Sequence, residues 1–304
     1  MRASGGTYVI TGATSGIGLE AARRLAATAD RLVVQGPEPE GAAVDAIARI
    51  TAGSTADVVY VSCDYGRLAD VVVGASALAE AAGAPIDGLV NNAGVPGADR
   101  RRTTGDGHER TLQVNYLAMV LLTELLEPRL ADGARIVNLA SATHAMAQLD
   151  LPDLELQRGY SPVRAYARSK LAIVMYTRWL AGRMPRGITA VSIQPGVIDT
   201  GLLHAMFGSM GGSVGTGADS ILSALAADAR GGEYFDEGRL VEPSAEARDD
   251  RLAADLMART LDMLAPFLAG TTDSAQASRI DPQASRIDTA ASGVATRKLR
   301  LSSR

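Results

Sequence analysis

The chain alternates short β-branched stretches with longer stretches rich in alanine and leucine, and this alternation limits the folds open to it. Strands that alternate with helices at such spacing form βαβ units, whose right-handed crossovers build a parallel sheet. We therefore predict an α/β fold with one domain and a doubly wound parallel sheet in three layers, α/β/α. The predicted strands are 7–10, 31–35, 57–61, 87–90, 134–140 and 188–193. The predicted helices are 16–27, 42–50, 68–82, 109–130, 162–184 and 244–264.

A glycine-rich turn, Thr11-Gly-Ala-Thr-Ser-Gly-Ile-Gly18, joins the first predicted strand to the first predicted helix. Glycines allow a tight turn and a close approach of the backbone to a pyrophosphate, and a helix amino terminus offers free N–H groups. Alone, such a turn is weak evidence, but its place between a strand and a helix favours dinucleotide binding. The predicted contacts are Gly12, Thr14, Ser15, Gly16, Ile17 and Gly18.

Three other short motifs follow predicted strands. Asp64-Tyr65 follows the third strand, Asn91-Asn-Ala-Gly94 ends the fourth, and Pro195-Gly-Val-Ile-Asp-Thr200 follows the sixth. The carboxyl ends of parallel strands meet at one edge of a sheet, where ligands bind. Each motif alone could be a simple turn, but their order along the chain predicts one shared cleft.

A tyrosine and a lysine lie four residues apart in the fifth predicted helix, Tyr166-Ala-Arg-Ser-Lys170, and therefore share one helix face. A free phenol has a pKa of about 10, and a nearby ammonium lowers it, which would tune Tyr166 as an acid or base. Only two of the 30 basic residues are lysine, and Lys298 is the other. A lysine retained here hints that the fixed fork of an arginine is a poorer substitute.

Together these motifs resemble the short-chain dehydrogenase/reductase family, over roughly residues 7–264. The resemblance implies a Rossmann-like domain and hydride transfer between NAD(P)(H) and a carbonyl or alcohol. It implies that Ser141 bonds the substrate oxygen, Tyr166 moves the proton, Lys170 tunes Tyr166 and Asn115 holds a water in the proton relay. The cofactor contacts that it implies beyond the glycine turn are Gly36, Glu38, Asp64, Tyr65, Asn91, Ala93, Gly94, Tyr166, Lys170, Pro195, Gly196 and Thr200.

The gap between Ser141 and Tyr166 is longer than in compact members of the family. It resembles the retinol-dehydrogenase-like and WW-domain-oxidoreductase-like branch, which includes bacterial ketoreductases of secondary metabolism. The segments 105–109 and 232–246 agree with that branch. His144 and His204 lie near the expected substrate mouth, where packing is a more ordinary role for histidine than catalysis.

The residues after the second strand leave the choice between NAD and NADP open. The branch often places an arginine there to pair with the 2′-phosphate of NADP, whereas this chain has Gly36-Pro37-Glu38. Glu38 would repel a phosphate, or would accept hydrogen bonds from the ribose hydroxyls. The branch favours NADP, and the local residues do not.

Apolar residues follow Thr200, where the family keeps a substrate lid, expected here at about 201–232. They favour a hydrophobic ketone, aldehyde or secondary alcohol, unless they only pack on the sheet. Within this lid, the glycine-rich segment 208–217 is typical of a mobile loop. The residues concerned are Leu202, Leu203, Met206, Phe207 and Met210.

The bulk composition excludes several function classes. A formal charge of −4 gives no general attraction to nucleic acid, and a single cysteine, Cys63, excludes an internal disulfide. No apolar run is long enough to span a membrane, and no metal site is expected. We expect a catalytic domain at 1–268 and a disordered or loosely packed tail at 269–304. The expected location is the cytoplasm. The family resemblance implies a homodimer through the helices of Asn115 and Tyr166, although members of this branch can also be monomers.

Two other classes of protein remain as alternatives. A non-catalytic regulatory homologue of the family would bind the dinucleotide only, but such relatives usually lose the tyrosine or the lysine. A lyase-like relative would have a ruined glycine motif and an arginine at position 170, whereas this chain has Lys170 and an intact turn.

Overall fold

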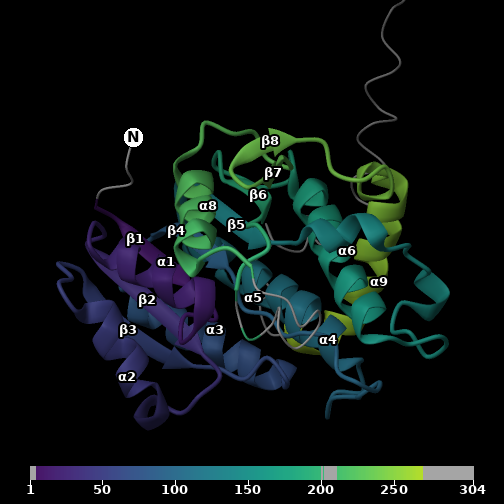
Figure 1. The fold of residues 1–304 in the computed structure, drawn as a ribbon, viewed down its shortest axis with the longest axis horizontal. Helices are drawn as coiled ribbons and strands as arrows, with labels where there is room; N and C mark the ends of the chain where they lie inside the picture. The colour runs from purple at the N-terminus through teal and green to yellow at the C-terminus, as the bar shows by residue number, and fades with distance from the viewer. Residues whose placement is uncertain (1–4, 200, 202–210, 270–304) are drawn as a thin grey trace, which may run out of the picture. The chain divides into compact units, whose positions relative to one another are not determined.

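The computed structural model describes residues 5–199, 201 and 211–269, which belong to one compact unit apart from residue 269. Its sheet has the strand order β3-β2-β1-β4-β5-β6-β7-β8, and all strands are parallel except β8 (Figure 1). The order reverses between β1 and β4, so a crevice opens at their carboxyl ends. The strands are β1 Thr7–Ile10, β2 Arg31–Gly36, β3 Asp57–Ser62, β4 Ile86–Asn91, β5 Leu130–Leu139, β6 Thr189–Gln194, β7 Tyr234–Asp236 and β8 Arg239–Val241.

Two layers of helices enclose this sheet. Helices α1, α2 and α8 pack together on one side, whereas α3, α5 and α6 form the other layer and carry α9 on their outer surface (Figure 1). The three-layer prediction is therefore confirmed. The helices are α1 Gly16–Ala26, α2 Glu40–Thr51, α3 Leu68–Ala82, α4 Arg110–Leu112, α5 Ala118–Leu126, α6 Pro162–Leu180, α8 Val214–Ala226 and α9 Asp250–Leu268.

The six predicted strands and the first three predicted helices agree with the structure to within a few residues. The strands were recognisable because their central residues are apolar and buried on both faces. Val9, Val33, Leu89 and Val137, from four neighbouring strands, are 0% exposed. Such a sheet must be covered by helices, which is the basis of the fold prediction.

Four local predictions need correction. The helix expected at 109–130 is broken into α4, a π-helical turn at Gln113–Leu117 and α5. The helix expected from residue 244 begins at Asp250, after a short 3₁₀ turn. Of the loop expected at 208–217, residues 208–210 lie outside the described residues and residues 214–217 belong to α8, which the Ser213 hydroxyl caps by accepting from the N–H of Thr216. The short strands β7 and β8 were not expected.

Helix α8 belongs to the sandwich, although it falls within the range expected for the lid. It packs along α1, and a Cβ at Gly217 would lie 2.9 Å from Ile17 Cγ1. Gly217, in the first turn of α8, is therefore a glycine because α1 packs closely against it, and not because the segment has to move. The lid residues 202–210 and the tail from 270 lie outside the described residues. None of the described helices is long and apolar enough to cross a membrane.

Candidate active site

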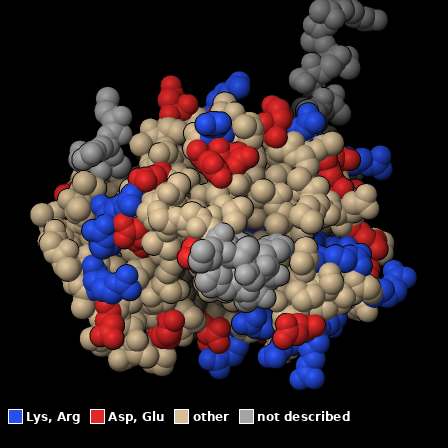
Figure 2. Space-filling model, in the orientation of Figure 1, with Lys and Arg blue, Asp and Glu red and all other residues tan. Residues whose placement is uncertain are grey.

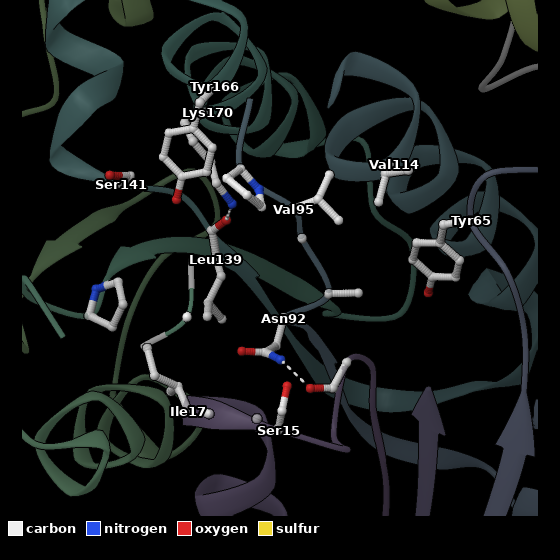
Figure 3. A pocket seen from close by; sticks show the side chains of 18 of the residues that line it. Ser15, Ile17, Tyr65, Asn92, Val95, Val114, Leu139, Ser141, Tyr166 and Lys170 are labelled. Carbon is white, nitrogen blue, oxygen red and sulfur yellow. Dashed lines mark hydrogen bonds between the residues drawn. The ribbon is translucent and has the colours of Figure 1, made fainter. Parts of the chain in front are cut away.

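A cleft of about 1020 Å³ runs along the carboxyl ends of strands β1 to β6, and residues following each of the six strands line it. Figure 3 shows Ser15 and Ile17 on one side of this cleft and the side chains of Ser141, Tyr166 and Lys170 on the opposite side. The structure therefore brings together the two ends of the sequence-predicted site, which are about 150 residues apart in the chain.

The glycine turn is held in a fixed shape by the residues that follow β4. Gly12 has a φ of +64°, which favours glycine, and a Cβ there would lie 2.7 Å from Ala93 Cα. The Asn92 side chain donates to the carbonyls of Thr11 (2.8 Å) and Gly12 (3.0 Å). In return, Thr11 Oγ1 accepts from the N–H groups of Asn92 and Ala93, both at 3.1 Å. The turn is thus pre-shaped before any ligand arrives.

Gln35, which sequence reasoning missed, supports the same turn from β2. Its Oε1 accepts from the N–H of Gly12 at 3.1 Å, and its Nε2 donates to the carbonyl of Cys63 at 2.7 Å. Gln35 is buried, and it joins the ends of three strands. A buried glutamine in an otherwise apolar strand was the available signal, since buried polar groups require partners.

Glu38 follows β2 and lines the cleft. Thr14 Oγ1 donates to Glu38 Oε1 at 3.2 Å, and Tyr60 donates to the Glu38 carbonyl at 2.6 Å. The other carboxylate oxygen, Oε2, is buried and accepts from none of the described residues. At Gly36 a Cβ would lie 2.5 Å from Thr14 Cγ2 and 2.7 Å from Glu38 Oε2, so this arrangement leaves no room for a side chain there.

Asn91 does not reach the cleft, unlike the neighbouring Asn92, Ala93 and Gly94. Its side chain is buried beneath the cleft and donates to Thr123 Oγ1 (3.0 Å) and Asn138 Oδ1 (2.8 Å). Asn91 is therefore a core residue that joins β4 to β5 and α5, and its expected cofactor contact needs correction. Asn92 lines the cleft instead, because successive strand residues point to opposite sides.

Of the other predicted cofactor residues, Gly36 does not line the cleft. Asp64 and Tyr65 after β3, and Pro195 and Gly196 after β6, line the cleft, whereas Thr200 lies outside the described residues. Lining residues that the sequence reasoning did not single out include Gln35, Asn92, Val95, Pro96, Arg110, Val114, Thr143, Met146 and Gln194.

Tyr166 projects from the first turns of α6 into the cleft and is 7% exposed (Figure 3). Burial raises the pKa of Tyr166 to about 12, against the lowering influence of its hydrogen bond with Ser141. The net lowering of this pKa that the sequence led us to expect is therefore not met, because burial outweighs the opposing influences. In a dry site the neutral phenol is favoured, which suits a proton donor.

Lys170 lies one turn further along α6, with its ammonium nitrogen 5.4 Å from the centre of the Tyr166 ring. Its Nζ donates to the carbonyl of Leu139 at 2.7 Å. Lys170 is 4% exposed, and burial lowers its pKa to about 7. The amine is thus poised to change charge near neutral pH, which an arginine could not do.

Asn115 lies in the π-helical turn, and its side chain has several partners. Its Oδ1 accepts from the N–H of Val95 (2.7 Å), and its Nδ2 donates to the Val95 carbonyl (3.0 Å) and to Ser169 Oγ (3.0 Å). The amide thus braces the strand end beyond Gly94 against α6. Single π-turns inside helices are frequent at functional sites, and here one interrupts the helix that sequence periodicity extends.

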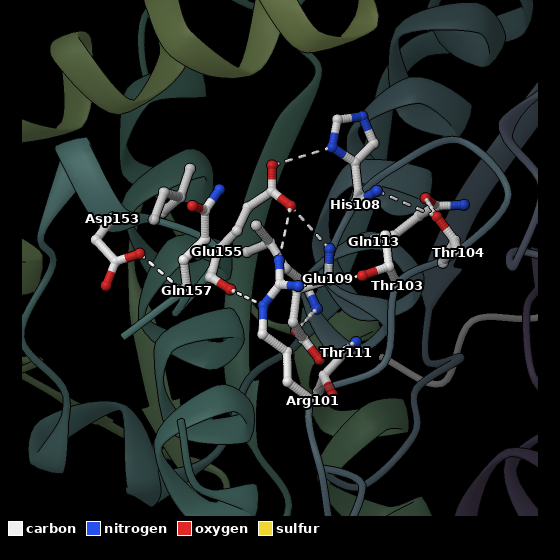
Figure 4. Close-up of polar contacts among 12 residues, drawn as sticks. Arg101, Thr103, Thr104, His108, Glu109, Thr111, Gln113, Asp153, Glu155 and Gln157 are labelled. Atoms are coloured by element: carbon white, nitrogen blue, oxygen red, sulfur yellow. Dashed lines mark hydrogen bonds and ion pairs between the residues drawn. The ribbon is translucent and has the colours of Figure 1, made fainter. Parts of the chain in front are cut away.

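A polar cluster centred on Glu155 holds α4 in place beside the cleft (Figure 4). Glu155 accepts from the N–H of Glu109 (2.9 Å) and pairs with His108 (3.2 Å). Glu109 in turn caps α4 by accepting from the N–H groups of Thr111 and Leu112. Burial acts to raise the pKa of Glu155, but these hydrogen bonds outweigh it, so the pKa is lowered. The long gap between Ser141 and Tyr166 therefore supplies an anchor for the helix that leads to Asn115.

The doubly wound sheet, the glycine turn and the tyrosine–lysine pair facing it define an oxidoreductase that uses a nicotinamide dinucleotide. The family model for short chain dehydrogenases matches residues 7–209, and the chain belongs to this family.

Relatives and solved structures agree with this assignment. The chain is 37% identical to mouse (Mus musculus) polyprenol dehydrogenase over 281 residues, 84% of this chain and 83% of the relative. It is 36% identical to a Streptomyces sp. protein described as a daunorubicin C-13 ketoreductase, over 83% and 90% of the two chains. A solved structure of an uncharacterised protein from Mycobacterium paratuberculosis is similar with a TM-score of 0.71 and 30% identity, covering 85% and 92%. The landomycin C-6 ketoreductase LanV, solved with NADP and rabelomycin, has a TM-score of 0.61 and 26% identity, covering 78% and 96%.

Proposed function

We propose that the chain interconverts a hydrophobic ketone or aldehyde and the corresponding alcohol, with Ser141, Tyr166, Lys170 and Asn115 as the working residues. The observation that carries the proposal is the placement of the Ser141, Tyr166 and Lys170 side chains on one wall of the cleft, opposite the glycine turn (Figure 3). A protein that only binds the dinucleotide would not require the buried phenol of Tyr166 beside the buried amine of Lys170.

The residues present fit a nicotinamide dinucleotide. The amino terminus of α1 and the shaped turn at Gly12 suit the pyrophosphate, and Glu38 Oε2 offers an unused acceptor to a ribose hydroxyl. When bound, the nicotinamide supplies or accepts the hydride. In the reductive direction Tyr166 gives its phenolic proton to the substrate oxygen, and Ser141 donates a hydrogen bond that stabilises the charge developing there. Lys170 stabilises the resulting phenolate and helps it regain a proton.

The substrate end of the cleft is mainly apolar. Met146 and Val197 line it and are 70% and 59% exposed, although large apolar side chains are usually buried. Together with Val95, Pro96 and Ile198 they favour a hydrophobic substrate with one reacting oxygen. Two of the relatives are named for a polyprenol and for daunorubicin, which supports this substrate class.

The proposal is tested by following absorbance of the reduced nicotinamide with panels of hydrophobic and polar carbonyl compounds. We expect turnover of long-chain or polycyclic ketones and aldehydes, and a kcat/KM at least about tenfold lower for small polar analogues that leave the apolar wall uncovered. Faster turnover of the small polar analogues would contradict the proposed substrate class.

We further propose that NADH binds more tightly than NADPH. The Glu38 carboxylate would accept from a ribose hydroxyl of NADH but would repel the 2′-phosphate of NADPH, and the only cations among the described lining residues are Arg110 and Lys170. The affinity for NADH should exceed that for NADPH by about 10- to 100-fold. Glu38→Gln should weaken NADH binding by about tenfold, since it removes a charge-assisted hydrogen bond, and should narrow the preference. Titration of protein fluorescence with each nucleotide measures both.

Arg110→Gln is the matched control for this prediction. Arg110 lines the same cleft but belongs to α4, whereas Glu38 follows β2. Loss of Arg110 should therefore leave the preference for NADH over NADPH unchanged. Tighter binding of NADPH by the wild-type protein, abolished in Arg110→Gln, would show that Arg110 reads the phosphate, and the Glu38 proposal would then be wrong.

We also propose that the protein is a monomer. The outer surface of α5 and α6, the helices expected to form a dimer, is covered by α9 of the same chain. Tyr116 bonds Thr260 Oγ1 of α9 at 2.8 Å, and Leu256, Met257 and Leu264 are fully buried there. Light scattering after gel filtration should give one chain of 31.5 kDa. A dimer that persists at micromolar dilution would contradict the monomer.

A further inference from the structure

His144 lies directly behind the proposed active site, in the 3₁₀ turn Ala142–Met146 that follows Ser141. It is 3% exposed, and it is absent from the residues that line the cleft, although Thr143 and Met146 on either side line it. The edge of its ring meets the ring of Tyr234 at a centroid distance of 4.9 Å and an angle of 61°. A buried histidine beside a reacting serine, yet turned away from the substrate, needs an explanation other than proton transfer.

Both ring nitrogens of His144 have backbone partners. Nδ1 lies 2.8 Å from the carbonyl oxygen of Ser141, and Nε2 lies 3.2 Å from the backbone nitrogen of Ser244. A backbone N–H can only donate, so Nε2 must be the acceptor and carries no proton. The neutral ring must then carry its proton on Nδ1 and donate it to the Ser141 carbonyl. The two contacts together specify one tautomer.

The surroundings favour this neutral form. Burial lowers the pKa of His144, against the raising influences of the Ser141 carbonyl and of Asp236. An imidazolium would direct a second N–H at the N–H of Ser244, so protonation would break that contact.

The turn that contains His144 also sets the direction of the Ser141 side chain. Ser141 Oγ accepts from the N–H of Thr143 at 3.3 Å, and the N–H of His144 donates to the Ser141 carbonyl at 3.0 Å. The Ser141 carbonyl therefore receives two donors from His144, one from its backbone and one from its ring. On the far side, Ser244 belongs to the segment that leads through Ala247, buried at 0% exposure, into α9.

We infer that His144 is a positioning residue: its Nδ1–H donates to the Ser141 carbonyl and so aims the Ser141 hydroxyl at the substrate oxygen, while the N–H of Ser244 selects this tautomer. This inference rests on the proposed role of Ser141 in the reaction. Because His144 does not line the cleft, it acts only through Ser141.

The two ring contacts can be removed separately, which gives a sharp test. His144→Asn keeps an amide donor near the place of Nδ1 and loses the acceptor for Ser244. His144→Gln places its amide oxygen near the position of Nε2 and loses the donor to Ser141. His144→Phe loses both. For each variant, kcat, KM, NADH affinity and Tm are measured with one carbonyl substrate.

We expect His144→Gln and His144→Phe to lower kcat by about 10- to 100-fold, the cost of a misdirected hydrogen bond to the reacting oxygen, with NADH affinity changed less than about twofold. His144→Asn should keep kcat within about threefold although its Tm falls as far as that of His144→Gln. Equal losses of kcat in the Asn and Gln variants, or a kcat that follows Tm across all three, would make His144 a packing residue only and overturn the inference.

A second measurement is independent of turnover. The chain has three histidines, so the ¹⁵N resonances of His144 in labelled protein can be assigned by their loss in His144→Asn. We expect a protonated Nδ1 and an unprotonated Nε2, and a proton on Nε2 would overturn the inference whatever the activity. Failure of the proposed function would look different, because wild type would then show no more carbonyl reduction than Tyr166→Phe.

Discussion

Replacement of Tyr166 by phenylalanine is expected to lower kcat by about 10²- to 10⁴-fold, the range that one positioned acid or base contributes. The phenol is 7% exposed and burial raises its pKa to about 12, so at neutral pH it holds the proton that the reacting oxygen needs. No other described side chain that lines this wall supplies a neutral O–H donor of comparable acidity, because serine and threonine hydroxyls are far weaker acids. NADH affinity should change less than about twofold, since the ring remains.

Tyr160→Phe is the matched control for this prediction. Tyr160 precedes α6, and its hydroxyl donates to the carbonyl of Ala98 at 2.8 Å, but it does not line the cleft. Its loss should cost about 1 kcal/mol of stability and leave kcat within about threefold. Retention of more than a tenth of the wild-type kcat by Tyr166→Phe, measured from absorbance of the reduced nicotinamide, would remove Tyr166 from the role of proton donor.

Much of the fold was predictable because a strand that is buried on both faces has a nearly continuous run of apolar residues. Residues 7–10, 31–35 and 134–140 are apolar over their central parts, as a sheet between two helical layers requires. The cleft was predictable for a related reason, since every residue that follows such a strand lies at one edge of the sheet. Four short motifs at that edge specified both its place and the family.

The wrong predictions have their causes in tertiary contacts and in burial, which the periodicity of a short segment does not reveal. The π-turn at Gln113–Leu117 depends on the contact of Asn115 with Val95, which lies 20 residues away in the chain. Helix α8 was hidden by glycines that look like loop residues, although Gly217 serves close packing on α1. The raised pKa of Tyr166 reflects the depth of its burial, which spacing within a helix cannot show.

Some expectations remain predictions. The preference for NADH that we attribute to Glu38 is one of them, and the substrate lid expected at residues 202–210 lies outside the described residues. The expected cytoplasmic location and the nature of the tail after residue 269 likewise stay predictions.

Lys170→Met is expected to lower kcat by about 10²- to 10³-fold and to remove a pH dependence from NADH binding. Burial lowers the pKa of Lys170 to about 7, so the free enzyme loses the ammonium charge as pH rises through neutrality. Bound NADH would offer ribose hydroxyls and phosphate charge that favour the ammonium, so its pKa should be higher in the complex. Binding above pH 7 must then take up a proton.

The sign of the effect follows from these two pKa values. Below pH 7 Lys170 is protonated in both states, and NADH affinity should not vary with pH on account of this group. Above pH 7 only the complex keeps the proton, so affinity should fall by up to about tenfold per pH unit until the pKa of the complex is reached.

Calorimetry in two buffers of different ionisation enthalpy measures the proton uptake directly. Lys170→Met should bind without uptake, and Lys170→Arg, which stays charged at every pH tested, should do the same while recovering little kcat. Equal proton uptake by wild type and Lys170→Met would assign the ionisation to another group and leave Lys170 with only a structural contact to Leu139.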